Sequence, residues 1–354
     1  MTHHQPYMLR CLELAKQGAG YVAPNPLVGA VLVYNERIIG EGWHKEYGKA
    51  HAEVNCIDLA IKKGFKEEIE KSTLYVSLEP CAHFGKTPPC ADLIISHKIP
   101  KVVIGCRDPF KEVNGRGIEK LKAAGIEVVT GVLEDECGEL NKRFFTFHTK
   151  QRPYIILKWA QTADGFIAGD GSKRILISNE FSNRLVHKWR SEEAAIMVGT
   201  NTALSDNPEL TTRLWPGPSP VRLVIDMNLR LPGSLKIFDG SVKTIVFNTI
   251  REEEKPNLSF IKLDKEKLFM PQLMSALYKL QLQSVLVEGG AALLQTFIES
   301  GVWDEARVIV NDELSSRLLS GGEGLPAPVL KNQQLVSKEQ ISTDTISYFR
   351  NTKQ

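Results

Sequence analysis

A chain of 354 residues is too long for a single ordinary domain, and it suits two domains that each bury a hydrophobic core. Its 42% hydrophobic and 24% charged residues are typical of a globular protein, and a net charge of +2 without a concentrated basic face argues against a nucleic-acid partner. No apolar run is long enough for a bilayer and no signal-peptide core is present, so we expect a cytoplasmic protein without a membrane partner.

Cysteine and histidine are unevenly distributed along the chain. All six cysteines precede residue 140, and every histidine except His187 precedes residue 150. Cytoplasmic thiols stay reduced, so the cysteines are available as ligands or as small core residues. The asymmetry predicts two domains with different chemistry, residues 1–149 and residues 150–354.

The first domain opens with a predicted amphipathic helix over residues 6–18, followed by strands over 27–34 and 37–43. Between helix and strand, two prolines hold Asn25 in an extended loop. Its carboxamide both donates and accepts, as is needed to read the amide edge of a pyrimidine. A turn-forming asparagine explains the same loop equally well.

Residues 51–90 carry the strongest chemical signal in the chain. They supply one imidazole, one carboxylate two residues later, and two thiols, in the runs HAE and PCAHFGKTPPC. Catalytic zinc takes three protein ligands and leaves a fourth position for water, so we predict His51, Cys81 and Cys90 as zinc ligands. Glu53 is expected to stay off the metal and to move protons as the catalytic acid and base.

The spacing of these residues bears on how specific the signal is. Zinc nucleobase deaminases carry H-x-E followed by P-C-x-x-C, whereas eight residues separate the two cysteines here. Helices predicted over residues 51–64 and 90–97 would place His51 and Cys90 at helix starts, where the helix dipole favours a thiolate. As an alternative, His83 could be a fourth ligand and make the zinc purely structural.

Further polar residues are expected near the metal. His44 and Lys86 are close to the ligands in sequence and could meet a phosphate or a sugar. The alternation continues with a strand over residues 101–106, a helix over 117–125 and a strand over 126–131. Asp108 follows the first of these strands, where α/β proteins place ligand contacts, and the sheet should be largely parallel or mixed.

Together, HAE, PC, GKTPPC, PNPLVGAVLV and DP…VNGRG resemble the deaminase half of the bifunctional diaminohydroxyphosphoribosylaminopyrimidine deaminase/reductases of riboflavin biosynthesis. That family has the long cysteine spacing ending in TPPC. The resemblance implies a cytidine-deaminase-like three-layer α/β/α fold and the zinc and proton-shuttle roles given above. From the residues themselves we expect four substrate contacts, Asn25, His44, Lys86 and Asp108. Phe110 departs from the family, which often has asparagine there.

The second domain is predicted to begin after a helix-like run, residues 136–150, and a proline break. Strands and helices then alternate, which indicates a second α/β core. The strands are expected over 154–160, 194–199, 221–226, 243–248, 284–290 and 306–311, and the helices over 182–190, 273–281 and 291–300. The Gly-Gly turn at residues 289–290 could bring backbone N–H groups to an anion, although a tight turn alone explains it.

The runs LKWAQTADGFIA, HKWRSEEAAIMVGTNTALSDNPELTTR and VLVEGGAALLQTFI resemble three motifs of the reductase half of the same family. The resemblance implies a dihydrofolate-reductase-like fold that binds NADPH. The cofactor contacts would be Ala160, Ile175, Thr202, Asp206, Met227, Gly290, Ala291, Ala292, Leu293, Leu294, Gln295 and Thr296. The substrate contacts would be Lys173, Arg190, Leu210, Arg213 and Glu288.

Two of these predicted substrate contacts suit a phosphate, because the guanidinium groups of Arg190 and Arg213 offer planar forks of donors. Two departures from the reductase motifs stand out. Ile175 replaces a common tryptophan, and the usual S-L-D-G reads T-A-D-G at residues 162–165.

The resemblance implies two consecutive reactions on a phosphorylated pyrimidine, zinc-dependent deamination and then NADPH-dependent reduction of the ribosyl side chain to ribityl. We also expect a homo-oligomer. Two other functions are compatible with the residues alone. One is a nucleoside or tRNA-base deaminase fused to an unrelated α/β domain, and the other is a zinc-stabilised binding module without activity.

Overall fold

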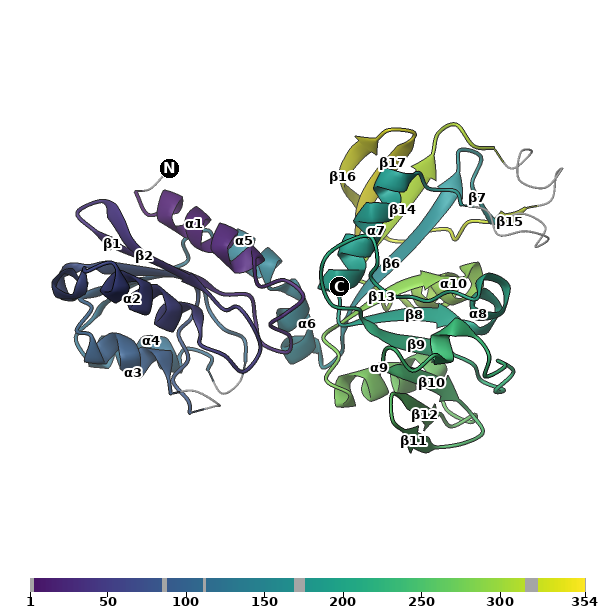
Figure 1. Ribbon diagram of the computed structural model, residues 1–354, viewed down its shortest axis with the longest axis horizontal. Helices are drawn as coiled ribbons and strands as arrows, with labels where there is room; N and C mark the ends of the chain where they lie inside the picture. The colour runs from purple at the N-terminus through teal and green to yellow at the C-terminus, as the bar shows by residue number, and fades with distance from the viewer. Residues whose placement is uncertain (1–2, 85–87, 111–112, 169–175, 316–323, 354) are drawn as a thin grey trace. The chain divides into compact units, whose positions relative to one another are not determined.

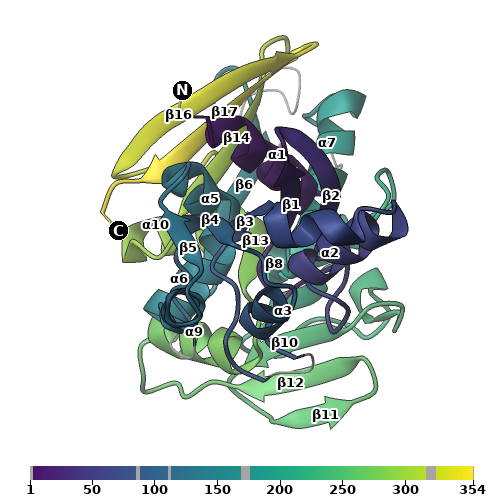
Figure 2. The same cartoon turned by 90° about the vertical axis from the view of Figure 1, so that its left-hand side faces the viewer.

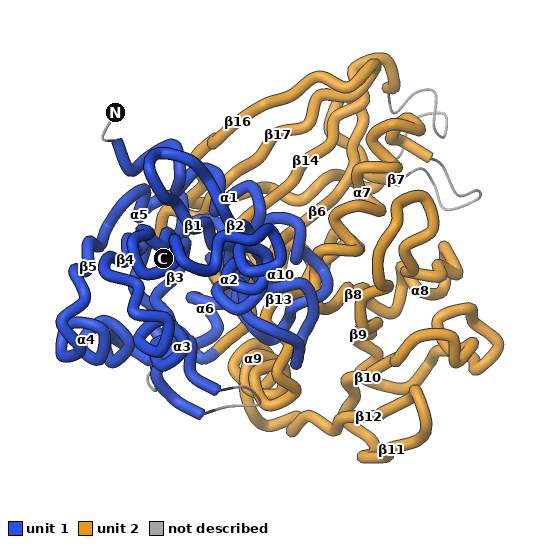
Figure 3. Tube along the Cα trace, turned by 60° about the vertical axis from the view of Figure 1, so that its left-hand side comes forward, with its two compact units in different colours: residues 1–151 blue, residues 152–354 orange. Residues whose placement is uncertain are grey.

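The computed structural model describes residues 3–84, 88–110, 113–168, 176–315 and 324–353. The chain forms two compact units, Met1–Gln151 and Arg152–Gln354, which Figure 3 colours separately. The division falls after Gln151, where the sequence predicts it after residue 149. No helix among the described residues is long and apolar enough to cross a membrane.

The first unit is built on a five-stranded mixed sheet in the order β2-β1-β3-β4-β5. β1 runs antiparallel to β2 and β3, whereas β3, β4 and β5 are parallel to one another. The strands are β1 (Gly29–Tyr34), β2 (Arg37–Trp43), β3 (Thr73–Leu78), β4 (Lys101–Cys106) and β5 (Glu127–Thr130). Parallel neighbours need crossover connections, and helices supply them here.

Helices cover both faces of this sheet (Figure 1). On one face lie α2 (Ala52–Lys62), α3 (Cys90–Ser96) and α4 (Arg116–Ala123), and on the other α1 (Gln5–Lys16) and α5 (Glu134–Leu140). Successive side chains of β1 point to opposite faces of the sheet and so contribute to both cores. Leu32 packs on the α2 side and Val31 on the α1 side. The three layers confirm the predicted α/β/α fold.

Two local predictions for this unit differ from the structure. The sequence reading assigns no element to residues 73–78, yet they form β3 at the centre of the sheet, buried at all but the first position. A strand buried on both faces shows no alternation. The sequence predicts one helix-like run over residues 136–150, but the helix is interrupted at Asn141, between α5 and α6 (Lys142–Lys150), and the Asn141 side chain bonds the backbone of Leu27.

The second unit is built on a ten-stranded sheet in the order β11-β12-β10-β9-β8-β13-β6-β14-β17-β16, with β15-β7 as a separate pair. Figure 2 shows the β11–β12 and β16–β17 ends at opposite sides of the unit. The strands are β6 (Tyr154–Thr162), β7 (Phe166–Ala168), β8 (Ala195–Gly199), β9 (Val221–Ile225), β10 (Thr244–Asn248), β11 (Glu253–Lys255), β12 (Leu258–Lys262), β13 (Ser284–Gly289), β14 (Glu305–Asn311), β15 (Leu325–Pro326), β16 (Gln333–Ile341) and β17 (Asp344–Asn351).

Helices again cover both faces. α9 (Phe269–Lys279) and α10 (Ala291–Ser300) pack on one core, and α7 (Glu180–Glu192) and α8 (Thr200–Asp206) pack on the opposite face. Short 3₁₀ turns, η1 (Lys66–Lys71) and η2 (Lys236–Phe238), complete the elements named in the two units. The second α/β core is therefore confirmed.

The central strands β12, β10, β9, β8, β13, β6 and β14 are parallel, so their carboxyl ends share one edge of the sheet. The segments that follow β8, β9 and β13 meet there, which is where open α/β sheets bind ligands. The β16–β17 hairpin has no counterpart in the sequence reading. Every β16 residue except the last is exposed, so this edge strand lacks the buried stripe that makes a strand recognisable.

Candidate functional site

Three elements bring His51, Cys81 and Cys90 together. His51 caps the N-terminus of α2, Cys90 is the first residue of α3, and Cys81 follows the end of β3 by three residues. The His51 Nδ1 atom lies 3.7 Å from the Cys81 sulfur and 3.3 Å from the Cys90 sulfur. The three ligand atoms lie within 4.8 Å of one another. The predicted ligands therefore converge on one point.

The donor set and its geometry fit zinc. Bond lengths of about 2.3 Å to sulfur and about 2.0 Å to nitrogen at tetrahedral angles would place a sulfur and a nitrogen ligand about 3.5 Å apart. Both measured separations are close to that value. The backbone N–H of Cys90 also donates to the Cys81 sulfur at 3.3 Å, which stabilises a thiolate.

The charges in this cluster suit a metal and a proton carrier. Hydrogen bonding from Cys90, with a further contribution from His51, lowers the pKa of the Cys81 thiol to about 4. Glu53, in the first turn of α2, is only 3% exposed, and burial raises the pKa of its carboxyl group. A carboxyl group with a raised pKa can hold a proton beside the ligands and release it again.

Asn25 and His44, both predicted to contact the substrate, contact each other. The Asn25 Nδ2 and His44 Nε2 atoms are 3.0 Å apart, while His44 Nδ1 lies 3.0 Å from the Ala50 carbonyl oxygen. With Nδ1–H donating to Ala50, Nε2 accepts from Asn25. The His44 ring meets the His51 ring edge-on at 5.3 Å, and burial lowers the pKa of His44. The Asn25–His44 pair therefore lies beside the ligand cluster, and its imidazole is uncharged.

Asp108 lies two residues beyond β4 and is 6% exposed. Burial raises the pKa of its carboxyl group to about 7, and the backbone N–H of Phe110 donates to Oδ1 at 2.8 Å. The backbone N–H of Asp108 donates to a second buried carboxylate, Glu79 Oε2, at 3.3 Å. Lys86, the remaining predicted contact of this unit, lies outside the described residues.

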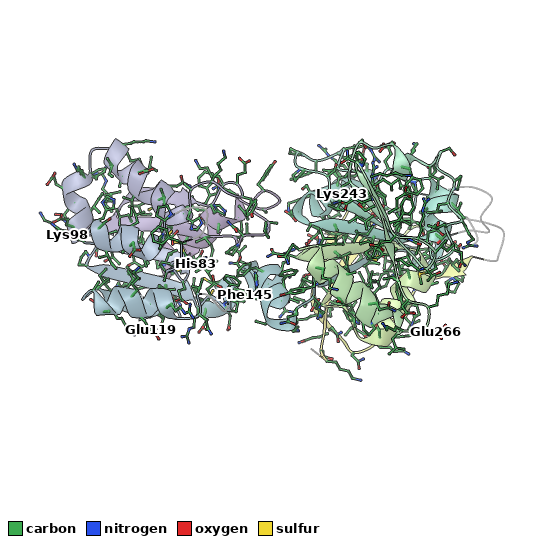
Figure 4. The ribbon with its side chains drawn as sticks, turned by 90° about the horizontal axis from the view of Figure 1, so that it is seen from below. His83, Lys98, Glu119, Phe145, Lys243 and Glu266 are labelled. Atoms are coloured by element: carbon green, nitrogen blue, oxygen red, sulfur yellow. The ribbon has the colours of Figure 1, made fainter. Side chains whose placement is uncertain are left out.

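His83 does not join the ligand cluster. Within the described residues, the group able to hold a metal comprises His51, Cys81 and Cys90 alone. His83, which Figure 4 labels, instead faces Phe110, with ring centroids 6.1 Å apart. The geometry therefore gives no support to a site closed by four protein ligands.

In the second unit, Arg190 and Glu288 form a buried ion pair. Arg190 on α7 donates to both carboxylate oxygens of Glu288 on β13, at 2.8 and 2.7 Å, and to the Thr211 carbonyl at 3.3 Å. Lys158 Nζ lies 4.0 Å from Glu288, and burial lowers the pKa of this lysine. The Arg190 guanidinium, which the sequence predicts to face a phosphate, thus pairs with the carboxylate of Glu288. Arg190, Glu288 and Lys158 together form one buried charged cluster.

Arg213 lies beside this cluster. Its backbone N–H donates to His187 Nδ1 at 2.9 Å, and its guanidinium pairs with Glu209 at 2.9 Å and donates to Thr211. The Arg213 side chain is 46% exposed, so an incoming phosphate can reach it. Leu210, another predicted contact, is 3% exposed and buries its side chain in the core.

Two of the residues predicted to bind NADPH, Gly290 and Thr202, meet beyond the carboxyl end of β13. Gly290 caps α10 directly after β13, and a Cβ atom there would lie 2.8 Å from the Thr202 hydroxyl of α8. This close approach brings two predicted contacts together from segments 88 residues apart and leaves a cradle that a side chain would fill. The positive end of α10 suits a pyrophosphate.

The remaining predicted contacts divide by position. Ala160 lies on β6, Asp206 ends α8, and Met227 follows β9. Leu294 is fully buried, Gln295 binds the Val329 backbone, and Thr296 binds the carbonyl of Ala292, so the first turn of α10 is the part of that run best able to meet a cofactor. Lys173 and Ile175 lie outside the described residues.

The sequence reading passes over four residues that shape these sites: Glu79, Asn141, Lys158 and His187. Lys158 stands inside a run read only as a strand and a family motif, and Glu79 stands in a run to which the sequence analysis assigns neither an element nor a role. A charged residue inside an apolar strand, as in YIILKWA, is a usable signal because a buried charge needs a partner. Asn141 carries no such signal, since its partner Leu27 is 114 residues away.

Two family models match the chain. Residues 1–106 match the "Cytidine and deoxycytidylate deaminase zinc-binding region", and residues 153–347 match the "RibD C-terminal domain". A riboflavin biosynthesis protein RibD from Aquifex aeolicus is 39% identical over 352 residues, covering 97% of each chain. One from Bacillus amyloliquefaciens is 38% identical, covering 89% of this chain and 87% of the relative.

Solved structures give the same result. A diaminohydroxyphosphoribosylaminopyrimidine deaminase/5-amino-6-(5-phosphoribosylamino)uracil reductase from Thermotoga maritima aligns with a TM-score of 0.89 and 38% identity over 98% of each chain. RibD from Acinetobacter baumannii aligns with a TM-score of 0.86 and 30% identity, again over 98% of each chain. Both halves of the chain are therefore matched in one order and at nearly full length.

Proposed function

The chain belongs to the RibD family of riboflavin biosynthesis proteins, and from that membership we propose the substrate and the working residues of each unit. It is a bifunctional enzyme, in which a zinc-binding deaminase region precedes a reductase domain. Its substrate is a small molecule. The homo-oligomeric state and the cytoplasmic location expected from the sequence remain predictions.

The proposed substrate of the first unit is 2,5-diamino-6-ribosylamino-4(3H)-pyrimidinone 5′-phosphate. Water replaces its 2-amino group, which leaves as ammonia. The second unit then reduces the ribosyl group to ribityl with NADPH and gives 5-amino-6-(5-phosphoribitylamino)uracil. The two activities in the name of the Thermotoga maritima protein support this pair of substrates.

His51, Cys81 and Cys90 would hold the zinc ion. Zinc in such a site acts as a Lewis acid and makes water a nucleophile near neutral pH. Glu53 accepts the proton that water gives up and passes it to the departing amino group. Its burial suits this work, because a raised pKa lets the carboxyl group carry the proton between the two events.

Asn25 and Asp108 are proposed to hold the pyrimidine. Asn25 lies beside the ligand cluster with His44, where its carboxamide can recognise ring donors and acceptors. Asp108 can accept from amino groups of the ring when ionised. A phosphate contact is proposed for Lys86 because it stands in the sequence between the two cysteine ligands.

In the second unit, the first turn of α10 and Thr202 would hold NADPH, which supplies the hydride. The reduction also needs a proton at the substrate nitrogen. Lys158 is proposed to hold that proton, because burial lowers its pKa, and Glu288 is proposed to orient the ribosyl chain. Arg213 is proposed to bind the phosphate, whereas Arg190 is proposed to hold Glu288 in place.

The convergence of one imidazole nitrogen and two sulfurs beside a buried carboxyl group is the observation that carries the deaminase half. A coupled assay tests the whole proposal. The chain should release one ammonia per substrate molecule without NADPH, and then oxidise one NADPH per molecule of deaminated intermediate. A chelator should stop ammonia release and leave reduction of supplied intermediate intact.

The two alternative functions make other predictions in this assay. A nucleoside or tRNA-base deaminase would release ammonia from cytidine or tRNA and would oxidise no NADPH. A structural zinc module would unfold on chelation with no activity to lose. Membership of the family over nearly the whole chain weighs against both.

A further inference from the structure

Glu79 is buried at the joint between the metal-ligand segment and the Asp108 loop. It follows β3 directly, its side chain is 4% exposed, and its backbone N–H donates to the Cys106 carbonyl at 3.0 Å. That bond extends the β3–β4 pairing by one residue, to two residues before Cys81. A carboxylate buried here needs full compensation by hydrogen bonds.

Four backbone N–H groups provide that compensation. Oε2 accepts from Asp108 at 3.3 Å and from Gly115 at 3.0 Å, and Oε1 accepts from Gly117 at 3.0 Å and from Ile118 at 3.3 Å. The carboxylate thus binds both ends of the segment from Asp108 to the first turn of α4. Hydrogen bonds to an ionised acceptor are about twice as strong as neutral ones.

The same place is tightly packed on its other side. A Cβ atom at Gly117 would lie 1.9 Å from the Pro80 carbonyl oxygen, so α4 starts in direct contact with the residue between Glu79 and Cys81. Cys81 is held in turn through its carbonyl, which accepts from Ala91 at 3.1 Å. A shift of the Asp108 segment would therefore move against the backbone that carries a metal ligand.

We propose that Glu79 is a positioning residue of the deaminase site, which sets where Asp108 stands relative to Cys81. This inference rests on the proposed deaminase function. Glu79 reaches the substrate only through the segment it holds. Its hydrogen bonds fix the backbone of Asp108 and of Gly115 relative to the end of β3.

The variant Glu79→Gln tests this role in the full-length chain. Glutamine keeps one accepting oxygen and replaces the other with an amide that faces two N–H donors, so one pair of loop hydrogen bonds is lost. We expect kcat/KM for deamination to fall roughly 10- to 100-fold, mostly through a higher KM, because small displacements of contact groups have effects of that size. Zinc content and the rate of NADPH oxidation with supplied deaminated intermediate should not change.

A second readout separates positioning from stability. In Glu79→Gln, hydrogen exchange at the amides of Asp108, Gly115 and Gly117 should become faster, while exchange in β4 stays the same. Glu119→Gln is the matched control, since it removes the same charge from an exposed residue of α4 (Figure 4). It should leave kinetics and exchange at the wild-type level.

A double-mutant cycle with Asp108→Asn tests whether Glu79 affects deamination through Asp108. If Glu79 acts through Asp108, the double variant should be about as slow as Asp108→Asn alone, whereas independent losses would multiply. Glu79→Asp, which keeps both oxygens on a shorter stem, should recover part of the activity.

Three results would overturn the inference. The first is an unchanged kcat/KM in zinc-loaded Glu79→Gln, and the second is multiplicative losses in the cycle. The third is loss of zinc in both Glu79→Gln and Glu79→Asp, which would make Glu79 a residue of the fold alone. A wild-type chain that releases no ammonia from the pyrimidine would overturn the proposed function as well, so the two failures are distinguishable.

Discussion

Arg190 on α7 and Glu288 on β13 join through two parallel hydrogen bonds, from Nε to Oε1 at 2.8 Å and from Nη2 to Oε2 at 2.7 Å. Burial alone would raise the pKa of Glu288, but the charges of Arg190 and Lys158 outweigh it and lower the pKa to about 2. The pair therefore fixes an ionised carboxylate at the carboxyl edge of the second sheet. This oriented carboxylate is the group that we propose to position the ribosyl chain in the reductase half.

Arg190→Lys should impair reduction without affecting deamination. Lysine keeps the charge but cannot make two parallel bonds, so the carboxylate of Glu288 loses its orientation. We expect a roughly 10- to 100-fold lower kcat/KM for NADPH oxidation with the deaminated intermediate. Ammonia release by the same preparation is the internal control. Reduction at the wild-type rate would show that the charge alone suffices and that the fork geometry is irrelevant.

Gly290→Ala should weaken NADPH binding. The added Cβ atom would lie 2.8 Å from the Thr202 hydroxyl, too close for an undisturbed contact, so either the Thr202 side chain or the start of α10 must shift. We expect the KM for NADPH to rise roughly tenfold or more, corresponding to about 1.4 kcal/mol of binding free energy. Gly233→Ala is the control, because nothing lies within 4 Å of a Cβ atom there. Equal KM values for both variants would argue against a cofactor cradle at Gly290.

Glu53→Gln should abolish most of the deamination while the metal stays bound. Glutamine has the same shape but cannot carry a proton, and positioned proton transfer contributes about 10²- to 10⁴-fold to a rate. Zinc content by elemental analysis should equal that of the wild type, because Glu53 is not among the proposed ligands. Near-normal ammonia release from the zinc-loaded variant would remove Glu53 from the mechanism.

His187 should make the second unit less stable as the pH falls. Burial, together with the charges of Arg190, Arg213 and Lys158, lowers its pKa from about 6.5 to about 4, although Glu288 acts in the opposite direction. The folded form then binds fewer protons than the unfolded form. The contribution of His187 to the free energy of unfolding is therefore complete above about pH 6.5, and it is lost as the pH falls towards 4.

The variant His187→Asn isolates this effect, since its side-chain oxygen can still accept from the Arg213 backbone N–H and does not titrate. Tryptophan fluorescence can follow the unfolding, because four of the five tryptophans lie in residues 152–354. Between pH 6.5 and 4 the melting temperature should fall less steeply in the variant than in the wild type. Parallel slopes would exclude His187 as the titrating group.

The sequence predicts the ligand set because the information behind that prediction is local and chemical. His51 and Glu53 share one helix start, and Cys90 begins another, so the chemistry of the zinc site follows from short runs and from known zinc preferences. The two α/β cores are also visible in the sequence, since amphipathic helices and apolar strands leave periodic patterns. Family motifs add the turn at residues 289–290, which we propose to bind the cofactor.

Only the tertiary structure decides which polar groups meet across long stretches of chain. Arg190 looked suited to a phosphate, yet its guanidinium lies on Glu288, 98 residues away. Glu79 and Asn141 showed no role until their backbone partners came within hydrogen-bonding distance. A sequence records which groups can ionise or donate, but a buried charge or amide acquires its function from the partner that compensates it, and that partner is fixed only when the strands and helices pack.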